Sequence, residues 1–276
     1  MRAENHTQVR APLDQAALRR ALARRGGGLW RDFEVVESTG STNADLLARA
    51  LVGEPEGAVL AAEEQRAGRG RMGRTWTSPP RAALTVSVLL RPDVPSARRG
   101  WLPLLAGLAV ATAVTRVTGV NTGLKWPNDL LTADAKLAGI LAEAAGDAIV
   151  VGIGLNVSTE PAELPAPRPG GLPATSLAAA GATTLDREEL LLAILAGLEH
   201  WYRAWQQAGG DPDRSSLRAE YTRLSATIGR TVRAELPGGQ ALSGSAAGVD
   251  SDGRLLVRVS SGAEVAVAAG DVVHLR

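Results

Sequence analysis

The spacing of hydrophobic residues along the chain predicts a mixture of helices and strands. Helical spacing covers residues 12–28, 41–51, 187–210 and 214–225. Short apolar or alternating runs, which are typical of strands, cover residues 32–38, 57–64 and 82–90. Residues 101–119 are too apolar for a surface helix, so we expect them to pack against a sheet.

The middle of the chain favours antiparallel pairing, because LKWP, DLL, AKLAGILAE and AIVVGIGLNV (147–157) read as consecutive strands with tight turns. A long connection rich in Pro, Ala and Gly follows at 158–183. After Ile228 the chain consists of short strand-like segments separated by PGG, SDG and SSG, which predicts a small SH3-like barrel. We therefore expect an N-terminal tail and helix (1–30), a main domain of helices and strands (31–226) and a C-terminal barrel (227–276).

Composition narrows the class of protein. The 276 residues are 45% hydrophobic and 21% charged, with a formal net charge of +1, so bulk attraction to nucleic acid or a membrane surface is not expected. Without Cys there are no disulfides or thiolate ligands, and His6, His200 and His274 are too scattered to suggest a metal centre. The N-terminus lacks the apolar core of a secretory signal, and no long apolar run is free of charges or breakers. We expect a cytoplasmic protein.

The chain is nearly devoid of lysine. Of its 30 basic residues only Lys125 and Lys136 are Lys, and no Arg lies between them. An ammonium is a compact charge, whereas a guanidinium is a wide planar fork, so a narrow site built for one rejects the other. The pair indicates a site that requires Lys, although two lysines left by chance on a solvated surface would give the same count.

The segment GRGRMGRTWTSPP (68–80) alternates Gly with Arg69, Arg71 and Arg74. Glycine lets the backbone pass close to a ligand, and arginine neutralises phosphate or carboxylate, so the pattern suits an anion such as a nucleotide. It lacks the GK[ST] element of a Walker loop. A flexible basic loop, or an RGG-like contact to single-stranded RNA, would have the same composition. Trp76 could stack on a base or anchor the loop to the core.

KWPNDLL (125–131) brings Lys125, Asn128 and Asp129 within five residues. Asp129 could orient Lys125 or approach a metal-bound phosphate, but PND is also a good turn sequence. In KLAGILAE (136–143), Lys136 should point away from the core unless it enters a cavity, and Gly139 indicates close approach by a ligand or another backbone.

STN (41–43) combines hydroxyl groups with the start of a predicted helix, which suits a small polar group, whereas Thr42 and Asp45 alone form an ordinary capping pattern. The glycines of GIGLNV (152–157) could line a cavity or belong to a packed strand.

Taken in order, STN, EEQRAGRGRMGRTWTSP, LKWPNDLL, KLAGILAE and VGIGLNV resemble the bacterial biotin protein ligases, and the terminal GDVVHLR resembles the closing strand of their barrel. The likeness covers the chain from about residue 30. It implies an α+β fold: a mixed, largely antiparallel sheet packed with helices, like that of class II synthetases, and a small SH3-like barrel. It also implies activation of biotin by MgATP to biotinyl-5′-AMP, then transfer to a lysine of a biotin carboxyl carrier protein domain of acyl-CoA carboxylases.

The resemblance also implies roles for individual residues. Biotin would be bound by Ser41, Thr42, Asn43, Gln65, Arg69, Gly70, Arg71 and Lys136. ATP or the adenylate would be bound by Arg71, Arg74, Trp76, Lys125, Asn128, Asp129, Asn156 and Arg276. Catalysis would depend on Lys136, Arg69 and Lys125, and Asp129 is the candidate ligand for Mg²⁺.

Three departures from the family pattern qualify this interpretation. Only about thirty residues precede the first predicted strand, too few for the winged helix-turn-helix of members that also act as repressors, so no repressor function is expected. Met72 occupies a position where a basic residue is common, and RAAL (81–84) begins where many members have glycine. The competing interpretations are a lipoate or octanoate ligase of similar fold and a non-enzymatic RNA- or partner-binding module.

Overall fold

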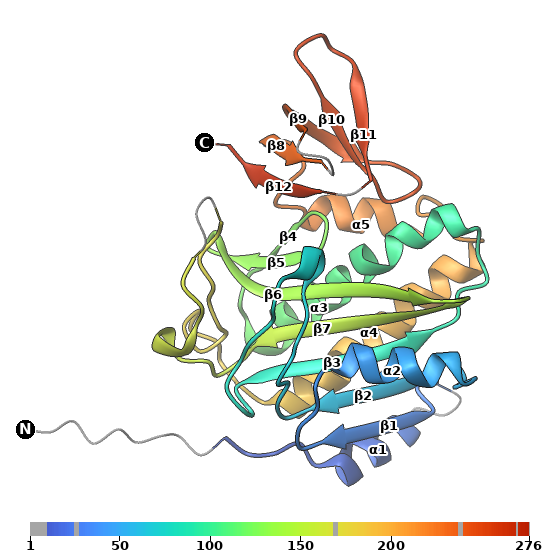
Figure 1. Ribbon diagram of the computed structural model, residues 1–276, viewed down its shortest axis with the longest axis vertical. Coiled ribbons are helices and arrows are strands. Elements are labelled where there is room, and N and C mark those ends of the chain that lie inside the picture. The colour runs from blue at the N-terminus through green and yellow to red at the C-terminus, as the bar shows by residue number, and fades with distance from the viewer. Residues whose placement is uncertain (1–9, 25–27, 168–170, 237–239, 269, 276) are drawn as a thin grey trace, which may run out of the picture.

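The computed structural model describes residues 10–24, 28–167, 171–236, 240–268 and 270–275. Two sheets organise the molecule, a large one at the centre and a small one above it (Figure 1). The large sheet has the strand order β1-β2-β3-β7-β6-β5-β4, with β1 and β2 parallel and every other pair antiparallel. Its strands are β1 (Asp32–Val36), β2 (Ala58–Ala62), β3 (Ala83–Leu90), β4 (Gly123–Lys125), β5 (Asp129–Thr132), β6 (Ala135–Ala145) and β7 (Ala148–Asn156).

Helices cover both faces of the large sheet. The helices are α1 (Gln15–Ala23), α2 (Thr42–Leu51), α3 (Leu102–Thr118), α4 (Arg187–Gln207) and α5 (Leu217–Leu224), with short 3₁₀ turns η1 (Arg71–Gly73), η2 (Ser96–Trp101) and η3 (Pro161–Glu163). In Figure 1 α2 lies in front of the sheet, and α3 and α4 lie behind it. Strand alternation divides the apolar side chains accordingly: Leu60 and Val150 pack under α2, whereas Val59 and Val151 belong to the core under α3.

The helix predicted over 12–28 is shorter than expected. It begins at Gln15, because Asp14 accepts a hydrogen bond from Ala17 N at 2.9 Å and caps it, and its end falls next to residues 25–27, which lie outside the described part. The predicted core helix at 101–119 is confirmed as α3. With η2 it forms one helical stretch, Ser96–Thr118, that is long and apolar enough to cross a membrane by length and composition. Since 67% of its apolar window is buried inside the protein, we describe it as a core helix.

The small sheet forms the C-terminal barrel predicted from the short strands and turns. Its order is β11-β10-β9-β8-β12, all antiparallel. The strands are β8 (Thr231–Glu235), β9 (Ala241–Val249), β10 (Leu255–Arg258), β11 (Glu264–Val267) and β12 (Asp271–His274).

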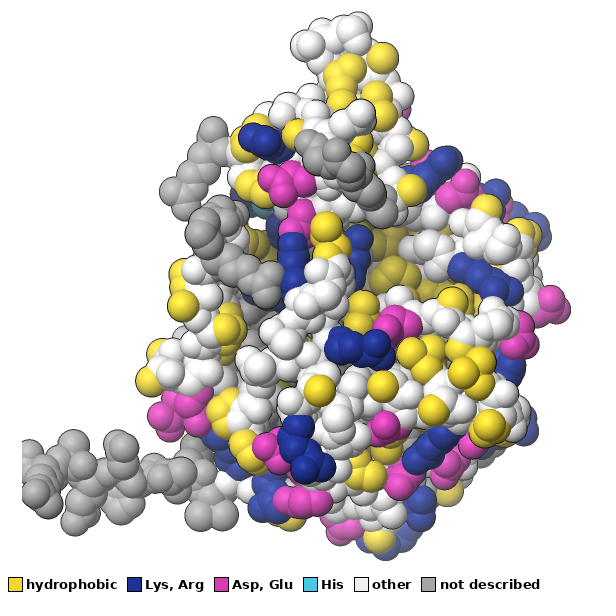
Figure 2. All heavy atoms as spheres, viewed as in Figure 1, with side chains coloured by type: hydrophobic (Ala, Val, Ile, Leu, Met, Phe, Trp, Pro, Cys, Tyr) yellow, Lys and Arg dark blue, Asp and Glu magenta, His cyan; other side chains and the backbone are white. Residues whose placement is uncertain are grey.

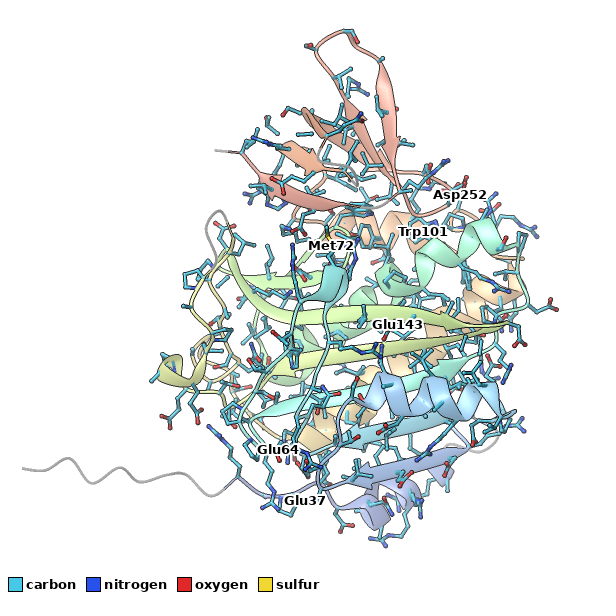
Figure 3. The ribbon with its side chains drawn as sticks, viewed as in Figure 1. Glu37, Glu64, Met72, Trp101, Glu143 and Asp252 are labelled. Carbon is cyan, nitrogen blue, oxygen red and sulfur yellow. The ribbon has the colours of Figure 1, made fainter. Side chains whose placement is uncertain are left out.

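The turn between β9 and β10 attaches this barrel to the large sheet. The indole N–H groups of Trp126 and Trp101 donate to the backbone oxygens of Gly253 and Ser251, at 3.0 and 3.1 Å. A Cβ added to Gly100 would lie 2.3 Å from the backbone oxygen of Asp252, so the two backbones touch (Trp101 and Asp252 are labelled in Figure 3). These contacts anchor the barrel against η2 and the end of β4.

Candidate active site

A cavity of about 620 Å³ opens on the α2 side of the large sheet, beneath the barrel. Figure 2 shows Lys or Arg side chains gathered at this hollow. Its lining comes from the start of α2, the loop 65–77, strands β4 to β7, residues 165–167 and 171–174, and strands β8 and β12. Every site residue predicted from the sequence, except Arg276, lines this cavity. Arg276 lies outside the described residues.

The start of α2 forms one polar end of the cavity. Ser41 is the helix cap and its Oγ accepts from Ala44 N at 3.5 Å, so the interpretation of Thr42 and Asp45 as a cap is wrong. The Thr42 hydroxyl instead lies 3.0 Å from Gln65 Oε1 and 2.6 Å from Ser87 Oγ, because its side chain points into the sheet. Asp45 accepts from the Thr39 hydroxyl at 2.5 Å. Thr42 is 3% exposed, so any hydrogen bond that its hydroxyl makes to a ligand must be made inside the cavity.

Two glycines of β7 make room for site residues, as the GIGLNV pattern allowed. A Cβ added to Gly152 would lie 2.2 Å from Asn43 Oδ1, and one added to Gly154 would lie 2.4 Å from Trp76 Cε2. Asn43 and the Trp76 indole therefore lie directly on the backbone of β7. A side chain at either position would displace the wall of the cavity.

The glycine- and arginine-rich loop is folded over the cavity. Gly70 N donates to Arg74 O at 2.7 Å and Trp76 N to Gly68 O at 2.9 Å, which makes a narrow hairpin. Met72 lies at its tip with φ 56°, and its side chain is 66% exposed (Figure 3). A long apolar side chain, which has no charge to offer a phosphate, thus stands at the outer tip of the loop.

Each arginine of the loop meets an acceptor on a different strand or turn. Arg69 Nη1 lies 3.3 Å from Glu143 Oε1, Arg71 Nη1 donates to Asn128 Oδ1 at 3.3 Å, and Arg74 forms an ion pair with Asp271 of β12. Burial lowers the pKa of Arg71, and Asp129 opposes this effect. The loop is therefore connected to β6, to the β4–β5 turn and to the barrel.

The opposite end of the cavity is cationic. Lys136 Nζ lies 2.6 Å from Asp129 Oδ1, so Asp129 pairs with Lys136 and not with Lys125, the partner considered from the sequence. Burial lowers the pKa of Lys125; Asp129 opposes this, while Lys136, Arg74 and Arg71 lower the pKa further. Asn128 is held in place because its Nδ2 donates to Ile140 O at 2.9 Å. This end has an excess of positive charge and suits a polyanion.

RAAL (81–84), one of the departures from the family pattern, spans the end of the turn before β3 and the start of that strand. Arg81, the first of these four residues, has φ 61°, which lies in the left-handed region that glycine adopts most easily. Its guanidinium donates to Glu37 at 2.7 Å. The turn into β3 is thus kept with a non-glycine residue in the glycine conformation.

A protein-held metal site is not evident. Among the described residues no group of three or more His, Asp or Glu side chains could hold a metal ion. Asp129, the predicted Mg²⁺ ligand, is one carboxylate paired to an ammonium. Mg²⁺ commonly binds through one or two carboxylates together with substrate phosphates. The donor set therefore fits a metal that arrives with a nucleotide better than a resident ion.

Two family models match separate parts of the chain. Residues 34–159 match the Biotin/lipoate A/B protein ligase family and residues 227–275 match the Biotin protein ligase C terminal domain. The Biotin–[acetyl-CoA-carboxylase] ligase of Mycobacterium tuberculosis is 47% identical over 274 residues, which cover 98% of both chains. This chain belongs to the biotin protein ligase family.

Solved biotin protein ligases share the architecture. The enzyme from Aquifex aeolicus, in complex with biotin and ATP, aligns with a TM-score of 0.74 and 26% identity over 88% of this chain and 98% of that one. The Leishmania major ligase, in complex with biotinyl-5-AMP, aligns with a TM-score of 0.59 and 26% identity over 86% and 99%. The family and fold predicted from the sequence are confirmed.

Sequence reasoning missed Asp271, which lines the cavity, and Ser87 and Glu143, which contact lining residues. Glu143 lies within KLAGILAE (136–143), and its carboxylate, four residues after Gly139 on the same face of an apolar stretch, was a usable signal. Asp271 could not be placed, because its contact with Arg74 depends on how the barrel docks.

Proposed function

We propose that this chain activates biotin with ATP and transfers it to a carrier lysine. In the first step the carboxylate of biotin attacks the α-phosphorus of ATP, a P–O bond breaks, and pyrophosphate leaves. In the second step a lysine amine attacks the acyl carbon of biotinyl-5′-AMP. AMP departs and an amide forms, with loss of the amine proton. By analogy with the relatives, the acceptor is a biotin carboxyl carrier protein domain of an acetyl-CoA carboxylase.

The observation that carries this proposal is the polarity of one continuous cavity. Its α2 end offers small polar groups of Ser41, Thr42 and Gln65, and its other end gathers the charges of Lys125 and Lys136. A neutral ring would fit the first end and a triphosphate the second. The carboxylate and the α-phosphate would then meet between them, where preorganised cations offset the repulsion of two anions.

Individual roles follow from these positions. Lys136 would contact the reacting carboxylate and the α-phosphate, and Lys125 with Arg71 and Arg74 would bind the remaining phosphates. Trp76 would form the wall next to adenine, and Asn156 would lie near the ribose. The loop 65–77 would cover the adenylate and keep water away until the acceptor arrives.

Mg²⁺ would enter as the complex with ATP and neutralise part of the charge on the phosphates. Asp129, a carboxylate in the lining of the cavity, would be its protein ligand. Its pairing with Lys136 supports a role in placing that ammonium as well.

The acceptor lysine needs a route to the acyl carbon. A second cavity of about 450 Å³ shares Arg71, Asn128 and Ile140 with the first. Its walls include Leu104, Ala142 and other apolar side chains, and the β9–β10 turn closes one side. We infer that the methylene stem of the lysine passes through this second cavity, with Arg71 at the junction.

Exchange of labelled pyrophosphate into ATP tests the first step. Exchange should depend on biotin and should be absent with lipoate, octanoate or no acid. Exchange driven by lipoate or octanoate would favour the alternative ligase of similar fold, which the name of the matched family also covers. Absence of exchange with all three acids would contradict the proposed function.

A further inference from the structure

Glu143 lies on β6 between the polar floor of the cavity and the loop 65–77 (Figure 3). Its side chain is 25% exposed, and its two oxygens have different partners. Oε2 accepts from Asn43 Nδ2 at 2.8 Å, and Oε1 lies 3.3 Å from Arg69 Nη1. One carboxylate therefore contacts both the first turn of α2 and the loop.

The contacts with Glu143 and with the backbone oxygen of Leu141 fix the direction of the Asn43 amide, and the contact with Glu143 is the shorter of the two. Asn43 Nδ2 also donates to the backbone oxygen of Leu141 at 3.2 Å, and both neighbours can only accept. Asn43 Oδ1 must then face Ser87, whose Oγ lies 2.6 Å away and has to donate. The carboxylate, together with Leu141 O, thus determines where the single proton of the Ser87 hydroxyl goes.

The donor and acceptor roles of Asn43 and Ser87 also fix the role of the Thr42 hydroxyl. Because Ser87 has given its proton to Asn43, the contact of 2.6 Å between Ser87 Oγ and Thr42 Oγ1 requires Thr42 as the donor. Thr42 Oγ1 also lies 3.0 Å from Gln65 Oε1, which already accepts from Thr42 N at 2.9 Å. The Thr42 proton is thus committed to acceptors of the protein. Toward a ligand the hydroxyl can only accept, so this end of the cavity suits an N–H donor such as a cyclic urea.

We propose that Glu143 is a positioning residue with two functions in the reaction. It sets the hydrogen-bond direction of the Asn43–Ser87–Thr42 chain, so that the polar end accepts ligand N–H groups. With the same carboxylate it holds Arg69, and hence the loop, over the cavity. The first function rests on the proposed function, since it takes the urea of biotin as the N–H donor.

Two substitutions separate the two functions. In Glu143→Gln the side-chain oxygen can still accept from Asn43, but the charge opposite Arg69 is lost. In Glu143→Ala the contacts with Asn43 and with Arg69 are both lost, and the Asn43 amide keeps only the weaker hydrogen bond to Leu141 O, at 3.2 Å, on its Nδ2 side. Neither substitution touches the reacting atoms, so kcat for pyrophosphate exchange should change little in both.

The expected results differ in KM and in release of the adenylate. Glu143→Ala should raise the KM for biotin about 10- to 100-fold, the range for loss of a hydrogen bond to a charged group. Glu143→Gln should restore this KM to near the wild-type value. Both variants should release biotinyl-5′-AMP faster than wild type, because neither holds Arg69.

Asp147→Asn is the matched control. It makes the same change of carboxylate to amide on the β6–β7 hairpin, where Asp147 pairs with Arg91 at 2.6 Å outside the cavity. Its KM and release rate should equal those of wild type. The inference is overturned if Glu143→Ala leaves the biotin KM unchanged, or if both Glu143 variants raise it equally. Failure of the wild-type protein to exchange pyrophosphate with biotin would instead refute the proposed function.

Discussion

Replacing Lys136 by Arg keeps the positive charge and tests whether the site needs a compact ammonium. Lys136 Nζ lies 2.6 Å from Asp129 Oδ1, and the end of the Lys136 side chain lies over the backbone of Gly139. A Cβ added to Gly139 would lie 3.4 Å from both Lys136 Nζ and Trp76 Cζ3, so ammonium and indole share the space above this glycine. A planar guanidinium is wider and would have to displace Trp76 or leave the reaction centre.

The size of the effect follows from the charge that is lost at the reacting atoms. A unit charge about 4 Å from a phosphate contributes about 4 kcal/mol at an effective dielectric constant of about 20. Removal of one preorganised donor to a developing oxyanion typically costs about 100- to 1000-fold in rate. Because the Lys136 side chain is 31% exposed, solvent screening favours the lower end of that range, about 100-fold.

Both Lys136→Ala and Lys136→Arg should therefore reduce the rate of biotin-dependent pyrophosphate exchange about 100-fold. Arg223→Lys is the matched control for the exchange of one cation for another, since Arg223 is largely exposed and pairs only with Glu220 among the described residues. Exchange by Lys136→Arg at close to the wild-type rate would refute the argument from shape. A large loss in Arg223→Lys would show that the assay reports on stability instead.

Three further predictions concern the acceptor route, pH and self-labelling. Ala142→Trp should fill the second cavity and slow transfer of biotin to a carrier domain while leaving pyrophosphate exchange intact; equal loss in both assays would contradict the route. Burial, helped by the charges of Lys125 and Arg230 and opposed by Asp134, lowers the pKa of His274 to about 4. Its neutral form is favoured in the folded state, so stability is full above the unfolded pKa of about 6.5 and falls as the pH drops toward 4. After allowance for solvent screening, His274→Gln should reduce the loss of unfolding free energy between about pH 7 and about pH 4.5 by about 1–2 kcal/mol, measured by urea unfolding. An unchanged pH profile would refute the assignment. Mass spectrometry after incubation with biotin and ATP should find self-biotinylation only at the α-amino group, Lys125 and Lys136, since the chain has no other lysine; labelling of other residue types would show that the adenylate is not selective for amines.

Much of the fold could be predicted from the sequence because its local signals agree with the tertiary structure. The apolar stretch 101–119 gave α3, and the alternating segments between 123 and 157 gave the antiparallel half of the sheet. Boundaries were less accurate where a polar residue decided them. Asp14 moved the start of α1, and Ser41 capped α2 in place of Thr42.

The candidate site was predictable as a set of residues but not as a set of contacts. STN, the Gly-Arg loop and the two lysines did gather in one cavity. The sequence left the role of Asp129 open, and its pairing with Lys136 was not predicted. That pairing depends on the register of β5 against β6, which contains a bulge between Leu130 and Leu131. Contacts between the loop and the barrel depend on docking, and no local pattern encodes docking.

The two lysines show how the arrangement of charges prepares the cavity for an anion. Without a ligand, Lys136, Arg74 and Arg71 repel the Lys125 ammonium and, together with burial, lower its pKa. A triphosphate placed among these groups would replace that repulsion by attraction and raise the Lys125 pKa again. Binding and protonation are therefore linked: above the lowered pKa, nucleotide binding should take up a proton at Lys125. An arginine there would stay charged at any pH, so lysine makes nucleotide affinity sensitive to alkaline pH in a way that the arginines of the loop are not.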